Sequence, residues 1–349
     1  RPLSRTLSYV NPDGSEVGLS NRWKDGESVV PYLMSYGYGP FRRLESSTAL
    51  PTTFHFAQPL SRFTTLFAEE FGLPDAERGL TEWYVASIDK EHSNHQAAKV
   101  ILDGMTTVIN ALLPEAVRVA VVTSEGVQFT TPSGVSLAAR ELSDGYRAFL
   151  ALVLDLLRHL AARIGPEFAA AIKHPEGGVV VDVAALVLID EADTHLHPSW
   201  QRELGPRLCQ VFPKIQFIVT THSPFVAQEA TDDGLFVLTE GPNGTVTVEK
   251  PIRSVRGWTA SQILTSPLFG LESTRDPETE ETIRAAADLT AKEQEKKLTA
   301  AEKKRLKAAR EWLRERLSAP GETYDDMLRQ EKMAKYVDDT LNRLENGHP

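Results

Sequence analysis

The sequence AALVLIDEADTHLHP, at residues 184–198, is the most informative segment of the chain. Its apolar residues 185–189 form an uninterrupted run, as in a strand of a parallel sheet that is covered on both faces. The run stops abruptly at Asp190 and Glu191. Because the carboxyl ends of buried parallel strands face the crevice where ligands bind, this segment predicts an α/β fold with two carboxylates at a binding edge.

The two adjacent carboxylates have the chemistry that nucleotide hydrolysis requires. One acid holds Mg²⁺, directly or through water, and the next acid polarises the attacking water. Asp190 fits the first role and Glu191 the second. The alternative is that a charged pair merely ends the strand and caps the following helix, which is a frequent arrangement.

Two further segments place polar groups where a phosphate could bind. Residues 216–221, QFIVTT, predict a second buried strand that ends at His222, whose imidazole could donate a hydrogen bond to a developing charge. Residues 142–146, LSDGY, open an apolar helix that extends to residue 163, where unpaired N–H groups and the helix dipole favour an anion. The alternatives are an ordinary loop histidine and a simple Ser or Asp helix cap.

In this order and at this spacing, the three segments resemble the ABC-type ATPase superfamily, in the branch that includes the SMC, RecF and OLD-like heads. The resemblance assigns to the signature motif Leu142, Ser143, Gly145 and Tyr146, and Asp144 replaces the usual first glycine of that motif. It assigns Asp190 and Glu191 to the Walker B pair. Asp193 falls in the D-loop at 193–198, and His222 matches the switch histidine. In that family the signature serine and glycine contact the γ-phosphate held by the opposite subunit. The resemblance therefore implies ATP and Mg²⁺ as cofactors, and a head-to-head dimer with two composite sites.

One motif of that family does not occur in this sequence. There is no G-x-x-x-x-G-K-[ST] phosphate-binding loop, and the nearest glycine clusters, YGYGP and PEGG, lack its Lys and its Ser or Thr. In the family this loop precedes the region that resembles residues 30–45, so we expect it upstream of Arg1. A head that never carried the loop is the alternative.

Other segments narrow the resemblance. YGPFRR at 38–43, DEADTHLHPSWQ at 190–201 and the long phrase at 257–281 are similar to the ATPase subunits of Septu-type anti-phage systems, often called PtuA. Those subunits act with an HNH-type nuclease, so the resemblance implies a nuclease partner that ATP-driven closure would gate. The alternatives are a nucleotide-sensing scaffold with negligible hydrolysis and a DNA repair or maintenance ATPase of the RecF or SMC type.

The rest of the chain is expected to be largely helical. Residues 60–113 show helical spacing and predict an insertion in a head that spans residues 1–250, while residues 117–139 alternate as strands do and predict a hairpin or meander. Residues 251–349 form the predicted helical docking region, in which Ala, Glu, Lys and Arg predominate from residue 279 onward. A thin apolar stripe there consists of Leu298, Leu306, Leu313 and Leu317. A solvated hairpin folded on the head is the alternative to a docking arm.

Charge and composition limit the partners. The 349 residues have a formal net charge of −10, which argues against a surface that coats nucleic acid or membrane as a whole. Residues 291–318 nevertheless hold ten Lys and Arg against five Glu, so a local DNA or RNA contact through this basic helix is possible. One cysteine, no signal-peptide core and no apolar run of about 18–20 residues favour a cytoplasmic protein without a membrane contact.

The missing loop gives a first prediction. The Lys and backbone N–H groups of that loop normally supply most phosphate contacts, and Asp190, Glu191 and His222 cannot replace them. The chain of residues 1–349, expressed alone, should neither bind ATP tightly nor hydrolyse it. Isothermal titration with ATP and Mg²⁺ measures this, and micromolar binding would show that the nucleotide site is misplaced.

Overall fold

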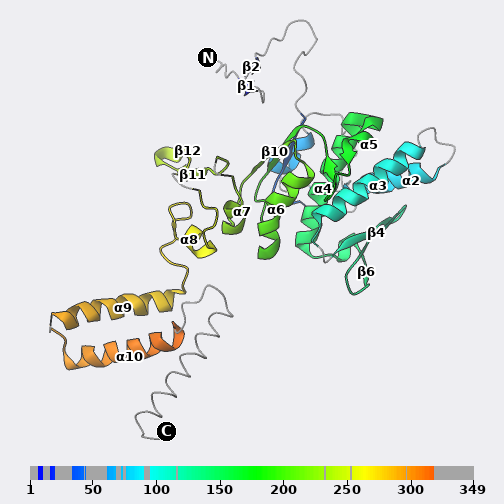
Figure 1. Cartoon of the computed structure of the whole chain (residues 1–349). Helices are drawn as coiled ribbons and strands as arrows, with labels where there is room; N and C mark the ends of the chain where they lie inside the picture. The colour runs from blue at the N-terminus through cyan, green and yellow to red at the C-terminus, as the bar shows by residue number, and fades with distance from the viewer. Residues whose placement is uncertain are drawn as a thin grey trace. The chain divides into compact units, whose positions relative to one another are not determined.

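The structure is a computed structural model, and its fold is mixed α/β. It describes residues 7–10, 16–19, 34–42, 44, 61–67, 72–73, 76–89, 95–114, 117–231, 233–251, 254–295 and 297–317. The chain divides into two compact units, residues 1–260 and residues 261–349. Figure 1 shows the elements of both units along the chain.

A parallel sheet lies at the centre of the first unit. Its order is β10 (Ile215–Val219), β9 (Ala185–Ile189) and β3 (Ser35–Tyr38). In the ladder, Ile189 pairs with both Tyr38 and Val219, so all three strands end at the same edge. The predicted strand at 185–189 is therefore confirmed.

Strand β10 differs from its prediction in two respects. It ends at Val219 instead of residue 221, and only Ile215 is buried, whereas Ile218 and Val219 are 51% and 37% exposed. Within the described part of the chain β10 pairs with β9 alone, which leaves its outer edge unpaired. The β-branched run had predicted burial on both faces, but the burial of a strand depends on neighbours that its own sequence does not reveal.

The main helices of the first unit pack on this sheet and on one another. Helix α4 (Asp144–Ile164) has its apolar face buried almost throughout, and it packs against α2 (Ala76–Ile88) and α3 (His95–Leu112). The three helices lie side by side in Figure 1. Helix α6 (Pro198–Val211) contacts α3 and the short α7 (Pro224–Gln228). The helical prediction for residues 60–113 is confirmed over the described residues, which also include η1 (Ser61–Phe63) and α1 (Thr64–Phe67).

The strands outside the central sheet are antiparallel. The predicted meander is confirmed as β4 (Arg118–Thr123), β5 (Gly126–Thr130) and β6 (Ser136–Ala138). The remaining pairs and short helices of this unit are β1 (Leu7–Val10) with β2 (Glu16–Leu19), β7 (Ile172–Lys173) with β8 (Val180–Val181), β11 (Val237–Glu240) with β12 (Val246–Glu249), η2 (Ala139–Glu141), η3 (Gly165–Glu167), α5 (Phe168–Ala171) and η4 (Pro242–Gly244).

The second unit is dominated by a helical hairpin. Helices α9 (Pro277–Gln294) and α10 (Ala300–Arg316) follow the short α8 (Ala260–Leu264), so the described residues from 279 onward are mainly helical, as predicted. Their seam is formed by Ala286, Leu289, Leu298, Leu306, Ala309 and Leu313. Leu317 was expected in this stripe but is 40% exposed, because α10 ends one residue before it. None of the described helices is long and apolar enough to cross a membrane.

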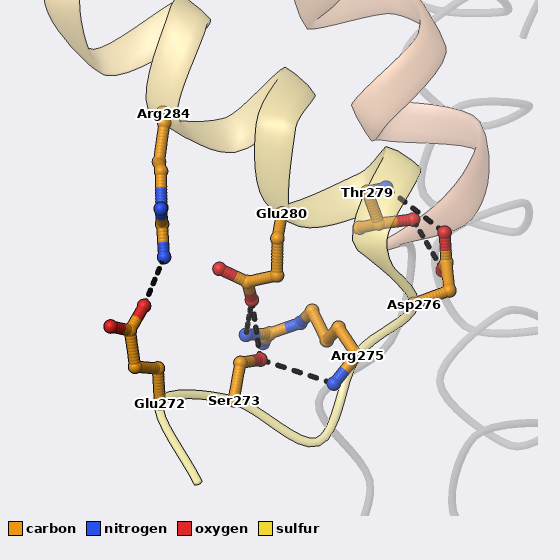
Figure 2. Close-up of polar contacts among 7 residues, drawn as sticks. All are labelled: Glu272, Ser273, Arg275, Asp276, Thr279, Glu280 and Arg284. Atoms are coloured by element: carbon orange, nitrogen blue, oxygen red, sulfur yellow. Dashed lines mark hydrogen bonds and ion pairs between the residues drawn. The ribbon is translucent and has the colours of Figure 1, made fainter.

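A polar network fixes the start of α9 (Figure 2). Asp276 caps the helix, because its carboxylate accepts hydrogen bonds from the Thr279 N–H at 3.0 Å and the Thr279 hydroxyl at 2.7 Å. In the preceding loop, the Ser273 hydroxyl donates to Glu280 and accepts from the Arg275 N–H at 3.1 Å. These contacts set where the hairpin begins.

Candidate nucleotide site

The two predicted acids stand at the edge where the parallel strands end. Asp190 follows β9 directly, and its N–H donates to the Tyr38 carbonyl at 2.8 Å, one residue past the ladder. The hydroxyl of Thr220 joins both acids, since it donates to Asp190 Oδ1 and accepts from the Glu191 N–H at 2.8 Å. The β9–β10 pairing therefore fixes the positions of Asp190 and Glu191 relative to the chain around residue 220.

Glu191 has an unusual backbone conformation. Its φ is 46°, in the left-handed region that residues other than glycine seldom adopt. Such a conformation costs on the order of 1 kcal/mol or more, and it persists where the surroundings hold it. The Thr194 hydroxyl donates to Glu191 Oε2 at 2.9 Å and the Thr194 N–H donates to the Glu191 carbonyl at 3.1 Å. Strain of this kind concentrates at functional sites, which supports a functional reading of this turn.

Arg42 contacts the backbone of the acid pair. Its side chain is buried, and its guanidinium donates to the carbonyls of Gly39 at 3.0 Å, Asp190 at 2.8 Å and Glu191 at 3.0 Å. Burial lowers the pKa of Arg42 to about 10, against the attraction of Asp190, Asp193 and Glu191, which raises it. Arg42 belongs to the YGPFRR segment at 38–43, but the sequence gives no signal of its contact with the two acids.

Asp193 and His222 meet in the adjacent loops. Asp193 Oδ1 accepts hydrogen bonds from the Thr221 hydroxyl and from the His222 N–H, the latter at 3.3 Å. His222 is exposed. The next residue, Ser223, caps α7, and its hydroxyl donates a hydrogen bond to Gln201 Oε1 at 2.7 Å. The structure thus brings four of the predicted site residues together at one edge of the sheet: Asp190, Glu191, Asp193 and His222.

The predicted signature segment lies at the start of α4. Leu142 is buried, whereas Ser143 is exposed at the N-cap and makes no capping hydrogen bond with its side chain. Gly145 packs on the loop that follows the acids, since a Cβ there would lie 2.4 Å from the His195 carbonyl oxygen. The Tyr146 ring packs on Trp200, with 4.9 Å between ring centroids. The segment contacts the loop at 193–198, and its described contacts do not include Asp190 or Glu191.

A cleft of about 370 Å³ opens beside these segments. It is lined by Pro40, Phe41, Arg42, Leu44, Asp144, Arg147, Ala148 and His195. The cleft therefore connects the loop that carries Arg42 with the first turn of α4 and with the loop after the acids.

The donor set suits Mg²⁺ held together with a phosphate-bearing ligand. Among the described residues no group of three or more His, Cys, Asp or Glu side chains could hold a metal ion alone. Mg²⁺ prefers oxygen ligands and in nucleotide sites commonly takes one or two carboxylates, with waters and phosphates completing its shell. Asp190 and Glu191 offer such carboxylates at the edge of the sheet.

Comparison with known proteins gives a consistent picture. Residues 55–227 match the family described as "AAA domain, putative AbiEii toxin, Type IV TA system". A "Septu protein PtuA" of Bacillus mycoides (strain KBAB4) is 36% identical over 134 residues, or 38% of this chain and 17% of the relative. The "Retron Ec83 probable ATPase" of Escherichia coli is 38% identical over 132 residues, covering 38% of this chain and 22% of the relative.

A second "Septu protein PtuA", from Bacillus thuringiensis, is 28% identical over 202 residues, which cover 56% of this chain and 48% of the relative. The chain thus spans less than half the length of each of these three relatives. The family match at 55–227 includes the segments at 142–146, 184–198 and 216–224, and the relatives that the chain resembles are named as Septu proteins and a retron ATPase.

The close approach at Gly145 gives a second prediction. In Gly145→Ala the new methyl group would overlap the His195 carbonyl, and such overpacking costs about 1–3 kcal/mol. This exceeds the roughly 0.5–1 kcal/mol that alanine gains over glycine in a helix. Urea denaturation should therefore show a lower free energy of unfolding. Gly205→Ala in α6 is the control, since nothing lies within 4 Å of its added Cβ, and no loss is expected there. Equal stability of the Gly145 variant would contradict the close contact.

Proposed function

We propose that this chain supplies the acid pair, the histidine and the signature segment of an ABC-like ATPase related to the Septu-type defence proteins, which together with a phosphate-binding loop binds ATP with Mg²⁺ and hydrolyses it in anti-phage defence. The observation that carries the proposal is the joining of Asp190 and Glu191 by the Thr220 hydroxyl, with His222 in the next loop. Residues from two neighbouring strands thus present acids and an imidazole at one edge, as a phosphate-cleaving site needs.

The proposed roles follow from chemistry and position. Asp190 would hold Mg²⁺, which when bound neutralises charge on the phosphates. Glu191 would accept the proton of the attacking water, and His222 would donate a hydrogen bond to the charge that develops on the transferred phosphate. Asp193 fixes the backbone of His222 through its N–H, which is a positioning role.

We further propose that the signature segment serves a second copy of the chain. Ser143 is exposed at the N-cap with no capping hydrogen bond, so the start of α4 presents a hydroxyl, while Gly145 is buried against the His195 carbonyl of its own chain. Such a helix start favours an anion. With Leu142 and Tyr146 packed beneath, this arrangement supports a head-to-head dimer in which each chain completes the site of the other.

Glu191 provides the direct test of hydrolysis. In the complete gene product, Glu191→Gln should keep ATP binding and lose turnover by roughly two to four orders of magnitude, as when a general base is removed. Asp190→Ala should instead weaken the Mg²⁺-dependent binding. Phosphate release and nucleotide titration measure the two effects, with Glu176→Gln in an exposed turn as the control. Near-normal turnover in Glu191→Gln would refute the assignment, and a wild type that binds ATP without turnover would indicate a nucleotide-sensing scaffold.

The α9–α10 hairpin is the proposed docking element for the effector, an HNH-type nuclease by analogy with Septu systems. Lys303, Lys304 and Lys307 are exposed on α10, and among the described residues only Lys307 of the three forms an ion pair, with Glu311 at 3.9 Å. The seam of the hairpin is small, with Leu306 as its most buried residue. Much of the surface of α10 therefore lies outside its contact with α9, and this exposed surface is strongly basic.

Charge reversal tests this docking role. The triple variant Lys303→Glu, Lys304→Glu, Lys307→Glu should leave ATP turnover intact and weaken binding of the nuclease or of DNA. If phosphates are the target, the salt dependence of binding should be shallower in the variant, because fewer counterions are released. Replacing the same three lysines by arginine keeps the charge and should keep the binding. Failure of folding or dimerisation with unchanged external binding would show that the hairpin is structural.

A further inference from the structure

Arg42 joins two segments that are far apart in sequence, the loop after β3 and the turn that carries the acids. We infer that Arg42 is a positioning residue, whose guanidinium holds the backbone of Asp190 and Glu191 in the conformation from which their carboxylates act. The inference rests on the proposed function for the catalytic meaning of the two acids. The contact of Arg42 with the two carbonyls, called the clamp below, rests on hydrogen bonds alone.

The hydrogen bonds define the clamp. One terminal nitrogen of Arg42 donates to the carbonyls of Gly39 and Asp190, at 3.0 and 2.8 Å, and the other donates to the carbonyl of Glu191 at 3.0 Å. The guanidinium thus spans two successive carbonyls of the turn and anchors them to its own loop. Two successive peptide planes are thereby fixed at the residue whose φ is 46°.

Arginine is suited to this task by shape as well as charge. Its planar fork presents several donors in fixed directions, while a lysine ammonium is a single point charge on a flexible stem. Since the pKa of Arg42 stays near 10 despite burial, the group is protonated at neutral pH. The attraction of Asp190, Asp193 and Glu191 offsets part of the cost of burying the charge. Within the described part of the chain, the hydrogen bonds of this buried cation all go to backbone carbonyls, so its contacts hold the backbone in place.

The clamp acts together with Thr220. The Thr220 hydroxyl holds the Glu191 N–H and one oxygen of Asp190, while Arg42 holds the two carbonyls. The N–H and the carbonyl of Glu191 are therefore fixed from opposite strands, β10 and β3, which flank β9. If Arg42 is lost, the Thr220 contacts remain, and the turn is held from the β10 side and by Thr194 alone. A change confined to Arg42 should thus loosen the turn without removing an acid.

The first arm of the experiment measures catalysis in the complete gene product. Arg42→Lys keeps a positive charge but cannot span both carbonyls, so kcat should fall about 10- to 100-fold, because small misplacements of catalytic groups have effects of this size. KM for ATP should change less than about threefold, since no substrate contact is removed. Arg202→Lys, at an exposed position of α6, is the matched control and should leave both constants unchanged.

The second arm needs no turnover. Hydrogen exchange of residues 1–349 should show faster exchange of the Glu191 and Ala192 N–H groups in Arg42→Lys, by about tenfold, with unchanged exchange in the core of α4. These N–H groups donate to the side chain and the carbonyl of Thr220, so their protection reports the turn directly. Arg202→Lys serves again as control.

The outcomes separate the two proposals. Exchange and kcat within twofold of the wild type would overturn the positioning role, and so would an effect on KM alone, which would make Arg42 a binding residue. General loss of protection in α4 would make Arg42 merely a fold-stabilising residue and would also overturn it. If exchange at Glu191 rises while Glu191→Gln retains full turnover, the clamp stands and the proposed function fails.

Discussion

The parallel pairing of β9 with β10 is the interaction on which the candidate site depends. It places Thr220 one residue past the strand, beside the first residue past β9, so that one hydroxyl reaches both acids. Without this register the positions of Asp190 and Asp193 relative to His222 would not be fixed, because both carboxylates accept hydrogen bonds from residues 220–222. A slip of one residue would turn every side chain of β10 to the opposite face and break all of these hydrogen bonds.

The sequence predicted those parts of the site that have a recognisable apolar periodicity or a characteristic pair of side chains. An apolar run followed by two acids predicted β9 and its carboxylates, and the second run predicted a neighbour with a histidine near its end. The meander at 117–139 and the helical character of the chain after residue 279 also followed from patterns of period 2 and 3.6. Each of these features is local, and each is encoded by residues adjacent along the chain.

The features that the sequence did not reveal are those that depend on contacts between distant segments. Arg42 meets its acceptors across about 150 positions, and nothing in YGPFRR distinguishes it from a surface arginine. The left-handed φ of Glu191 depends on Thr220 and Thr194, which a single motif cannot predict. The exposure of Ile218 and Val219 was missed for the same reason, because burial is a property of neighbours.

The absence of a side chain at Gly145 has a mechanical consequence. Helix α4 meets the loop after the acids through backbone atoms, with the place of a Cβ only 2.4 Å from the His195 carbonyl. A side-chain contact can absorb a small displacement by changing rotamer, but backbone against backbone cannot. A tilt of the long apolar α4 would therefore pass directly into the loop at 193–198, and from Asp193 to the N–H of His222. Because Gly145 has no side chain, movement of α4 is transmitted to the loops that carry the site with little loss.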